Sequence, residues 1–282
     1  PDFSARTRAH EYGGGDYTVH DGVVTFANDA DQRLYRQRPG EAPQPLTSAD
    51  GARYADMQID PARGRLLAVR EDHSAPGEAV NTLVAIALDD GAVATLAAGN
   101  DFYSSPRLSP DGRYLAWLTW NHPNMPWDGT ELWLAELSAD GTPRDAHRVA
   151  GGPTESIFQP EWSPPGPGNN GTLHFISDRS DWWNLYRLDD DTAEPVYPMA
   201  AEFGLPQWVF GMTTYAFLDA DQIICSYTAD GQRFMALLDT LSGDLRPLDV
   251  AATGAMLSAK GKRVVYVGAS PTAAAAVILL DL

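Results

Sequence analysis

One unit recurs along the chain, and a repeat constrains a fold more than any single motif does. The unit consists of a polar turn, a strand of alternating apolar residues, a variable loop, and a second strand that often carries Leu-Trp or Leu-Tyr. Its clearest copy runs from Leu108 to Leu118 and resumes at Glu131–Leu137. Asp111 and Gly112 supply the positive φ of a tight hairpin turn, and the flanking residues alternate with the period of a strand. The unit therefore predicts antiparallel β-structure.

The spacing of the copies predicts the architecture. Successive turns lie roughly 40–60 residues apart, as in four-stranded propeller blades, and no long helical pattern competes. A blade cannot bury both faces alone, so the copies must stack radially in one cooperative domain. We therefore expect an all-β fold, a β-propeller of about six four-stranded, WD-like blades around a central channel. The repeat units of this single domain, 1–282, span 10–48, 52–98, 102–150, 156–199, 207–249 and 250–282.

Charge and composition narrow the classes of partner. The 282 residues include 20 Lys and Arg against 38 Asp and Glu, and the resulting net charge of −18 repels phosphate backbones and anionic lipid surfaces. No stretch approaches the ~20 apolar residues of a membrane helix, and the start of the sequence has no signal-peptide core. A lone cysteine, Cys225, rules out an internal disulfide. We expect an acidic, soluble, cytoplasmic protein with no nucleic-acid or membrane partner and no cofactor.

The loops fall into two classes according to their place in a blade. The turns that connect the first strand to the second, and the third to the fourth, share one face of a propeller. Here they are short Asp-Gly turns and similar segments without candidate functional residues, such as 89–91, 139–141 and 242–244. Second-to-third loops and inter-blade connections share the other face, which we call the loop-rich face. There the residues are aromatic, acidic, basic or histidine. The candidate substrate or docking residues are Glu11, Tyr12, Arg70, Glu71, His73, His122, Trp127, Asp128, Arg179, Trp182, Trp183, Glu202 and Trp208.

Each group of candidates also has a structural explanation. The tryptophans could line a substrate cavity or pack one blade against the next, because propellers bury aromatic residues between neighbours. The acidic residues could hold the ammonium group of a peptide, or could form caps and ion pairs with the arginines within blades. His174 lies in a strand and is expected to be structural. Gly13-Gly14-Gly15 precedes no GK[ST] and indicates a loop with unusual backbone angles rather than a phosphate cradle.

Eight segments in order resemble the propeller of bacterial prolyl-oligopeptidase-family enzymes of the acylaminoacyl-peptidase and dipeptidyl-aminopeptidase kind. They are HEYGGG (10–15), QRLYR (32–36), REDH (70–73), DFYSSPRLSPDGR (101–113), WNHPNMPWDGTELW (120–133), ESIFQPEWSP (155–164), SDRSDWWNLYR (177–187) and EFGLPQWVFGM (202–212). The resemblance implies a propeller that caps an α/β-hydrolase catalytic domain, restricts the access of large substrates and lends residues to the cavity for a peptide substrate. In dipeptidyl-peptidase relatives, propeller glutamates bind the substrate ammonium group.

The catalytic motif of that family is not found in this sequence. Its nucleophile elbow reads G-x-S-x-G, and the nearest segment, Gly268-Ala269-Ser270-Pro271-Thr272, breaks the pattern at its last two positions. The Asp and His of a triad belong to the same hydrolase domain, so no catalytic residue is assigned here and the chain alone is expected to be inactive. The resemblance also implies an upstream piece of another blade.

Two other functions remain open from the sequence. The chain could be a free-standing propeller that binds a protein or peptide, which a longer reading frame without a hydrolase domain would favour. It could also be a metal-dependent six-bladed lactonase, although no HExxH, CxxC or EF-hand spacing occurs and no metal ligand is assigned.

Overall fold

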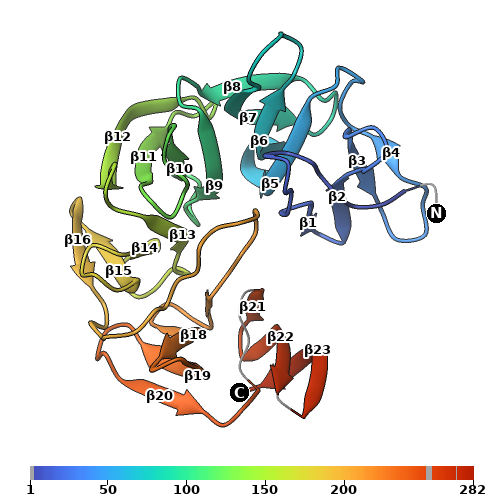
Figure 1. Ribbon diagram of the computed structural model, residues 1–282. Helices are drawn as coiled ribbons and strands as arrows, with labels where there is room; N and C mark the ends of the chain where they lie inside the picture. The colour runs from blue at the N-terminus through green and yellow to red at the C-terminus, as the bar shows by residue number, and fades with distance from the viewer. Residues whose placement is uncertain (1–2, 252–255, 271) are drawn as a thin grey trace.

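The computed structural model describes residues 3–251, 256–270 and 272–282, so parts of the expected 250–282 unit, namely 252–255 and 271, lie outside the described residues. The all-β fold is confirmed: over the described residues the strands form six antiparallel sheets arranged as blades in a ring (Figure 1). Within these same residues no α-helix occurs, and one short 3-10 turn, η1 (Pro61–Arg63), precedes β6. No helix there is long and apolar enough to cross a membrane.

The first three sheets each contain four strands. They are β1 (Tyr17–His20), β2 (Val23–Ala27), β3 (Leu34–Gln37) and β4 (Gln44–Pro45); β5 (Arg53–Asp60), β6 (Arg65–Asp72), β7 (Val80–Ala87) and β8 (Val93–Ala97); and β9 (Phe102–Leu108), β10 (Tyr114–Trp120), β11 (Glu131–Leu137) and β12 (Pro143–Gly151).

The remaining sheets contain four, four and, over the described residues, three strands. They are β13 (Ile157–Trp162), β14 (Leu173–Ser177), β15 (Asn184–Asp189) and β16 (Thr192–Pro195); β17 (Tyr215–Phe217), β18 (Gln222–Ala229), β19 (Gln232–Asp239) and β20 (Leu245–Leu248); and β21 (Leu257–Lys260), β22 (Arg263–Ser270) and β23 (Ala273–Asp281).

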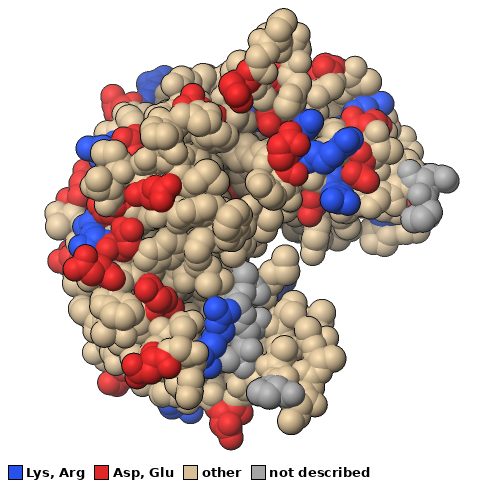
Figure 2. Space-filling view, in the orientation of Figure 1, with Lys and Arg blue, Asp and Glu red and all other residues tan. Residues whose placement is uncertain are grey.

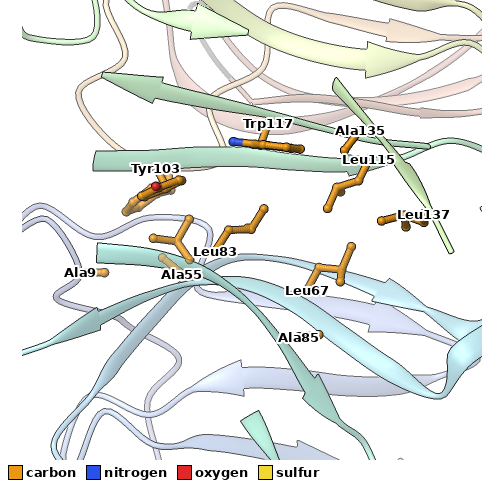
Figure 3. Packing of buried hydrophobic residues seen from close by; sticks show 12 residues of the cluster. Ala9, Ala55, Leu67, Leu83, Ala85, Tyr103, Leu115, Trp117, Ala135 and Leu137 are labelled. Carbon is orange, nitrogen blue, oxygen red and sulfur yellow. The ribbon is translucent and has the colours of Figure 1, made fainter. Parts of the chain in front are cut away.

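Apolar side chains fill the space between neighbouring blades. Leu67 and Leu83 of the second sheet face Leu115 and Trp117 of the third (Figure 3), and all four are at most 3% exposed. Complete burial of one such side chain stabilises the fold by roughly 1.5–3 kcal/mol. Apolar residues alternate along these strands, which is the pattern seen in the sequence. Because alternate side chains point to the same face of a sheet, the apolar ones meet in these clusters.

The first strand of each sheet lies nearest the axis, and three of these strands are bulged. The pairing register shifts in β5, β9 and β13, and a residue with positive φ lies at each shift: Asp56 (53°), Ser105 (53°) and Gln159 (47°). Such bulges bend a strand and redirect its side chains and backbone groups. The inner strands β1, β13, β17 and β21 line a cavity of about 890 Å³, together with parts of β22 and β23 of the sixth sheet.

Hydrogen bonds join neighbouring inner strands around the axis. Over the described residues every junction from the first sheet to the sixth has at least one. In ring order they include Asp56 N–H to Gly15 O (3.1 Å), Ser105 N–H to Asp56 Oδ2 (2.6 Å), Trp162 Nε1–H to Arg107 O (3.1 Å), Thr214 N–H to Gln159 Oε1 (2.6 Å) and Leu257 N–H to Thr213 Oγ1 (2.7 Å).

The ring of described residues is open between the first and the sixth sheets. Figure 2 shows a notch there that reaches toward the centre of the molecule. The two sheets that border it expose large apolar side chains: Val19 on β1 is 55% exposed, and Val277 and Leu279 on β23 are 76% and 61% exposed. Elsewhere in the ring, side chains at the same kind of position are covered by the next blade.

His174 makes the stability of the fold dependent on pH. It lies on β14, 3% exposed, with its Nδ1 donating to Thr172 O and its ring against Phe217 of the next sheet. Burial lowers its pKa from 6.5 to about 4. Below pH 6.5 the unfolded chain therefore binds a proton that the folded chain does not, and stability falls as the pH decreases toward 4.

We predict that His174→Gln will reduce this pH dependence. Between pH 7 and pH 5 the unmodified chain should lose about 2 kcal/mol more unfolding free energy than the variant, measured by urea denaturation at both pH values. The buried His10, whose pKa burial also lowers to about 4, is present in both proteins and cancels in the comparison. Equal losses in the two proteins would contradict the assignment of a neutral His174.

Candidate functional site

The connection between β16 and β17 crosses the ring and contacts segments on its opposite side. We call residues 204–212 the strap. Phe210 in the strap donates its N–H to Gly13 O at 3.0 Å, and Phe210 and Gly14 form an isolated parallel β-bridge. The Phe210 side chain is 3% exposed and lies 4.6 Å from the ring of His10, measured between centroids. The strap thus attaches the middle of the chain to its start across the propeller axis.

The three glycines at 13–15 are required by this crossing. All three have positive φ, at 70°, 89° and 56°, as expected for a loop with unusual backbone angles. A Cβ on Gly14 would overlap the Phe210 carbonyl group, and one on Gly13 would overlap the Thr7 carbonyl oxygen. Both the backbone conformation and the close approach of two segments therefore select glycine.

The crossing brings three of the predicted aromatic residues together. The ring centroids of Trp127 and Trp208 are 4.4 Å apart, and those of Tyr12 and Trp208 are 6.4 Å apart at an interplanar angle of 74°. Tyr12 is 68% and Trp208 55% exposed, while Trp127 is half-buried between the strap and its own loop. We call these three residues the aromatic triad.

The loop that carries Trp127 is held by hydrogen bonds at both ends. Asp128 Oδ2 accepts the Met125 N–H at 2.9 Å, and the Pro126 carbonyl accepts the Ser156 hydroxyl at 2.8 Å. At the start of the loop, His122 pairs with Asp101 at 3.1 Å. The His122 N–H bond to Asp101 lowers the pKa of that carboxyl. Asp128 and His122 are thus structural contacts of this loop as well as exposed candidates.

A second group joins Glu11, Glu71 and His73 around Arg53. Arg53 lies 2.8 Å from Glu11 and 3.7 Å from Glu71, and His73 Nε2 lies 3.3 Å from Glu71. Glu71 is 5% exposed and also accepts the His10 N–H at 3.1 Å. Burial raises the pKa of Glu71, against the opposing effect of His73 and Arg53. The effect of desolvation on this carboxylate is thus only partly compensated by Arg53, His73 and the His10 N–H group.

The other candidates lie outside these two groups. Arg70 pairs with Asp72 at 2.9 Å. Arg179 pairs with Glu155 at 2.8 Å and lies over the ring of Tyr186. Glu202 accepts the Trp183 N–H at 2.9 Å, and Trp182 is 40% exposed beside them. The three charged candidates of this group, Arg70, Arg179 and Glu202, therefore already have partners within the chain.

The structure also identifies contributors that the sequence did not single out as candidates. Arg53 holds both predicted glutamates of its group, and Phe210 anchors the strap. Gln207 lies with Tyr12 and Trp208 around a pit of about 30 Å³. The sequence could have indicated the strap, because this connection is long and has no strand pattern. It could not indicate that the strap contacts Gly13 and Gly14 across the ring.

The chemistry of this face is suited to recognition. It offers exposed aromatic rings and paired carboxylates, whereas the segment nearest to a nucleophile motif, 268–272, lies at the β22–β23 end and includes residue 271, which is outside the described residues. Within the described chain no group of three or more His, Cys, Asp or Glu side chains is placed to hold a metal ion.

Three solved structures are similar to nearly the whole chain. A puromycin hydrolase mutant complexed with PGG and puromycin hydrolase itself match 99% of the chain at 35% and 36% sequence identity, each with a TM-score of 0.90. A puromycin-hydrolysing peptidase of Mycobacterium tuberculosis matches 99% at 37% identity with a TM-score of 0.88. The chain spans 45% of the length of each of these proteins. No family model and no curated protein matches the sequence.

We predict that Gly14→Ala will release the strap and destabilise the fold by about 2 kcal/mol or more. The reason is the overlap with Phe210 in addition to the cost of a side chain at positive φ. Gly51→Ala is the matched control, because Gly51 has φ 80° and nothing within 4 Å of an added Cβ. Its expected cost is about 1 kcal/mol. Urea unfolding measures both, and equal losses would show that the crossing contributes nothing beyond backbone strain.

Proposed function

Because the chain belongs to the prolyl oligopeptidase family, as one of its β-propeller domains, we propose that it is the non-catalytic, substrate-selecting part of a serine peptidase. The observation that carries the proposal is the identity of 35–37% with puromycin-hydrolysing proteins over 99% of the chain. At that identity the likeness extends beyond the fold, which unrelated propellers share.

The loop-rich face supports a selecting role. The strap and the adjacent glycines line part of the cavity, through residues 14, 15 and 209–211. A substrate that entered the cavity past these residues would contact the strap. In this proposal the propeller admits small substrates around or past the strap and keeps large ones from the catalytic centre.

The partner in this proposal is an α/β-hydrolase catalytic domain of the longer protein. The proposed substrates are short peptides and aminoacyl amides, a class supported by the relatives that are named for hydrolysing puromycin. The candidate residues of the loop-rich face would contact this domain or the substrate. The cytoplasm is the proposed location.

We predict that catalysis requires the longer protein. The 282-residue chain should not react with a fluorophosphonate serine probe or hydrolyse aminoacyl reporter amides, whereas the product of the complete gene should do both. The reason is that the activated serine, its base and its oxyanion hole are one geometric unit on the hydrolase fold. Labelling of the 282-residue chain, or a complete gene without a hydrolase domain, would overturn the proposal.

Trp182 provides a test of docking on the loop-rich face. In the complete enzyme, Trp182→Ala should lower turnover or make the junction between domains easier to cleave with protease, because an exposed tryptophan often contributes strongly to an interface. The melting temperature of the 282-residue chain should change by less than about 2 °C, because the side chain is 40% exposed. A large loss of propeller stability with unchanged kinetics would instead assign Trp182 to packing within the blade.

A further inference from the structure

We propose that the aromatic triad, Tyr12, Trp127 and Trp208, is a binding site for one flat aromatic group of the substrate, such as the side chain of an aromatic aminoacyl residue. This inference rests on the proposed function and specifies the substrate class that the propeller selects. It assigns Trp208 and Tyr12 as contact residues and Trp127 as the support behind Trp208.

The fold holds these rings firmly while it leaves two of them exposed. Tyr12 follows a tight turn in which His10 and Glu11 both have positive φ, at 51° and 64°, and the Tyr12 N–H donates to His10 O at 2.8 Å. Trp208 is fixed two residues before the Phe210 anchor. Strained backbone of this kind persists where the surroundings impose it, and it concentrates at binding sites. Aromatic side chains at 68% and 55% exposure are therefore positioned, and are not merely left at the end of a loose loop.

The geometry of the rings suits a third ring. Tyr12 and Trp208 meet at 74°, with centroids 6.4 Å apart, and so form an open corner. Aromatic pairs favour offset-stacked or edge-to-face arrangements at centroid distances of about 4.5–7 Å. A flat group placed in the corner can stack on one ring and meet the other at its edge, which satisfies both preferences together.

The polar tips of the triad are also available to a ligand. Over the described residues, neither the Tyr12 hydroxyl nor the indole N–H of Trp127 or Trp208 has a hydrogen-bond partner. Tyrosine and tryptophan generally use these groups when they become buried. A substrate that covers the rings can therefore hydrogen-bond to these groups without breaking hydrogen bonds within the chain.

The shape of the surface favours a flat ligand over a protruding side chain of the catalytic domain. Side chains that anchor protein interfaces insert into well-packed pockets. The pit of about 30 Å³ that adjoins Tyr12 and Trp208 is also lined by His10, Trp120 and Gln207. That volume accommodates about one water molecule and is too small for a side chain. A planar group, in contrast, can lie across the exposed rings.

The test uses the complete enzyme and two aminoacyl reporter amides that differ only in the side chain, phenylalanyl and leucyl. Trp208→Ala and Tyr12→Ala should each raise KM for the phenylalanyl substrate by about 3- to 10-fold, the effect of losing one aromatic pair. The value of kcat and both constants for the leucyl substrate should change by less than about 2-fold. Trp208→Phe, which keeps a ring, should restore most of the loss.

Leu241→Ala is the matched control. Leu241 is 70% exposed and lies in the β19–β20 turn, which belongs to the face opposite the loop-rich face. Its replacement should therefore change the kinetic constants of neither substrate. Equal KM increases for both substrates in Trp208→Ala would overturn the proposal and assign the triad to domain docking. Unchanged constants for the phenylalanyl substrate would overturn it as well.

A binding measurement on the 282-residue chain separates this inference from the proposed function. Saturation-transfer NMR should detect contact of phenylalaninamide with the chain, little contact of leucinamide, and loss of the phenylalaninamide signal in Trp208→Ala. This readout needs no catalytic domain. If the complete enzyme proves not to be a peptidase while this selectivity holds, the proposed function fails and the aromatic site stands; equal signals for the two amides would remove the site.

Discussion

The hydrogen bonds between inner strands are the constraint on which the rest of this structure depends. Backbone hydrogen bonds pair the strands only within a blade. The junctions between blades therefore need apolar packing and a second source of polar contacts. Bulges in β5, β9 and β13 provide it by turning residues such as Asp56 and Gln159 toward the next inner strand. The left-handed backbone at these residues is costly by itself. It is retained because the bond that each bulge makes fixes the position of the neighbouring blade.

Charge is concentrated at the same level of the ring. Arg107 lies 3.3 Å from Asp56 of the preceding blade and 2.8 Å from Glu161 of the following one. Burial disfavours its charge, but the two carboxylates more than compensate and raise its pKa. Removal of Arg107 would leave the buried Asp56 carboxylate without this cation, which is more costly than never having had the pair. These three charged side chains therefore contribute to the alignment of three successive blades.

Local features of this fold could be predicted from the sequence, and distant ones could not. The hairpin from Leu108 to Leu118 follows from an Asp-Gly turn and alternation, and both signals lie within a dozen residues. The unusual backbone angles of the glycines at 13–15 were predicted for the same reason, and in the structure all three have positive φ. Their partner Phe210 was not, because nearly 200 residues separate the two segments and no pattern in either specifies the other. In the candidate site, Tyr12 and Trp208 could be predicted because aromatic residues in loops are typical of binding sites. Arg53 could not be predicted, because arginine is common on protein surfaces and nothing in the sequence places it between two glutamates.

The strap joins parts of the ring that are far apart in the sequence. The described ring is open between its first and sixth sheets, so the blades on the two sides of the opening are not joined there by inter-blade hydrogen bonds among described residues. The strap supplies a connection across the axis instead, from the fourth and fifth blades to the start of the chain. Trp208 lies two residues before Phe210, and Tyr12 lies one residue before Gly13. The contact that crosses the axis therefore also places Trp208 beside Tyr12, although nearly 200 residues separate them in the sequence.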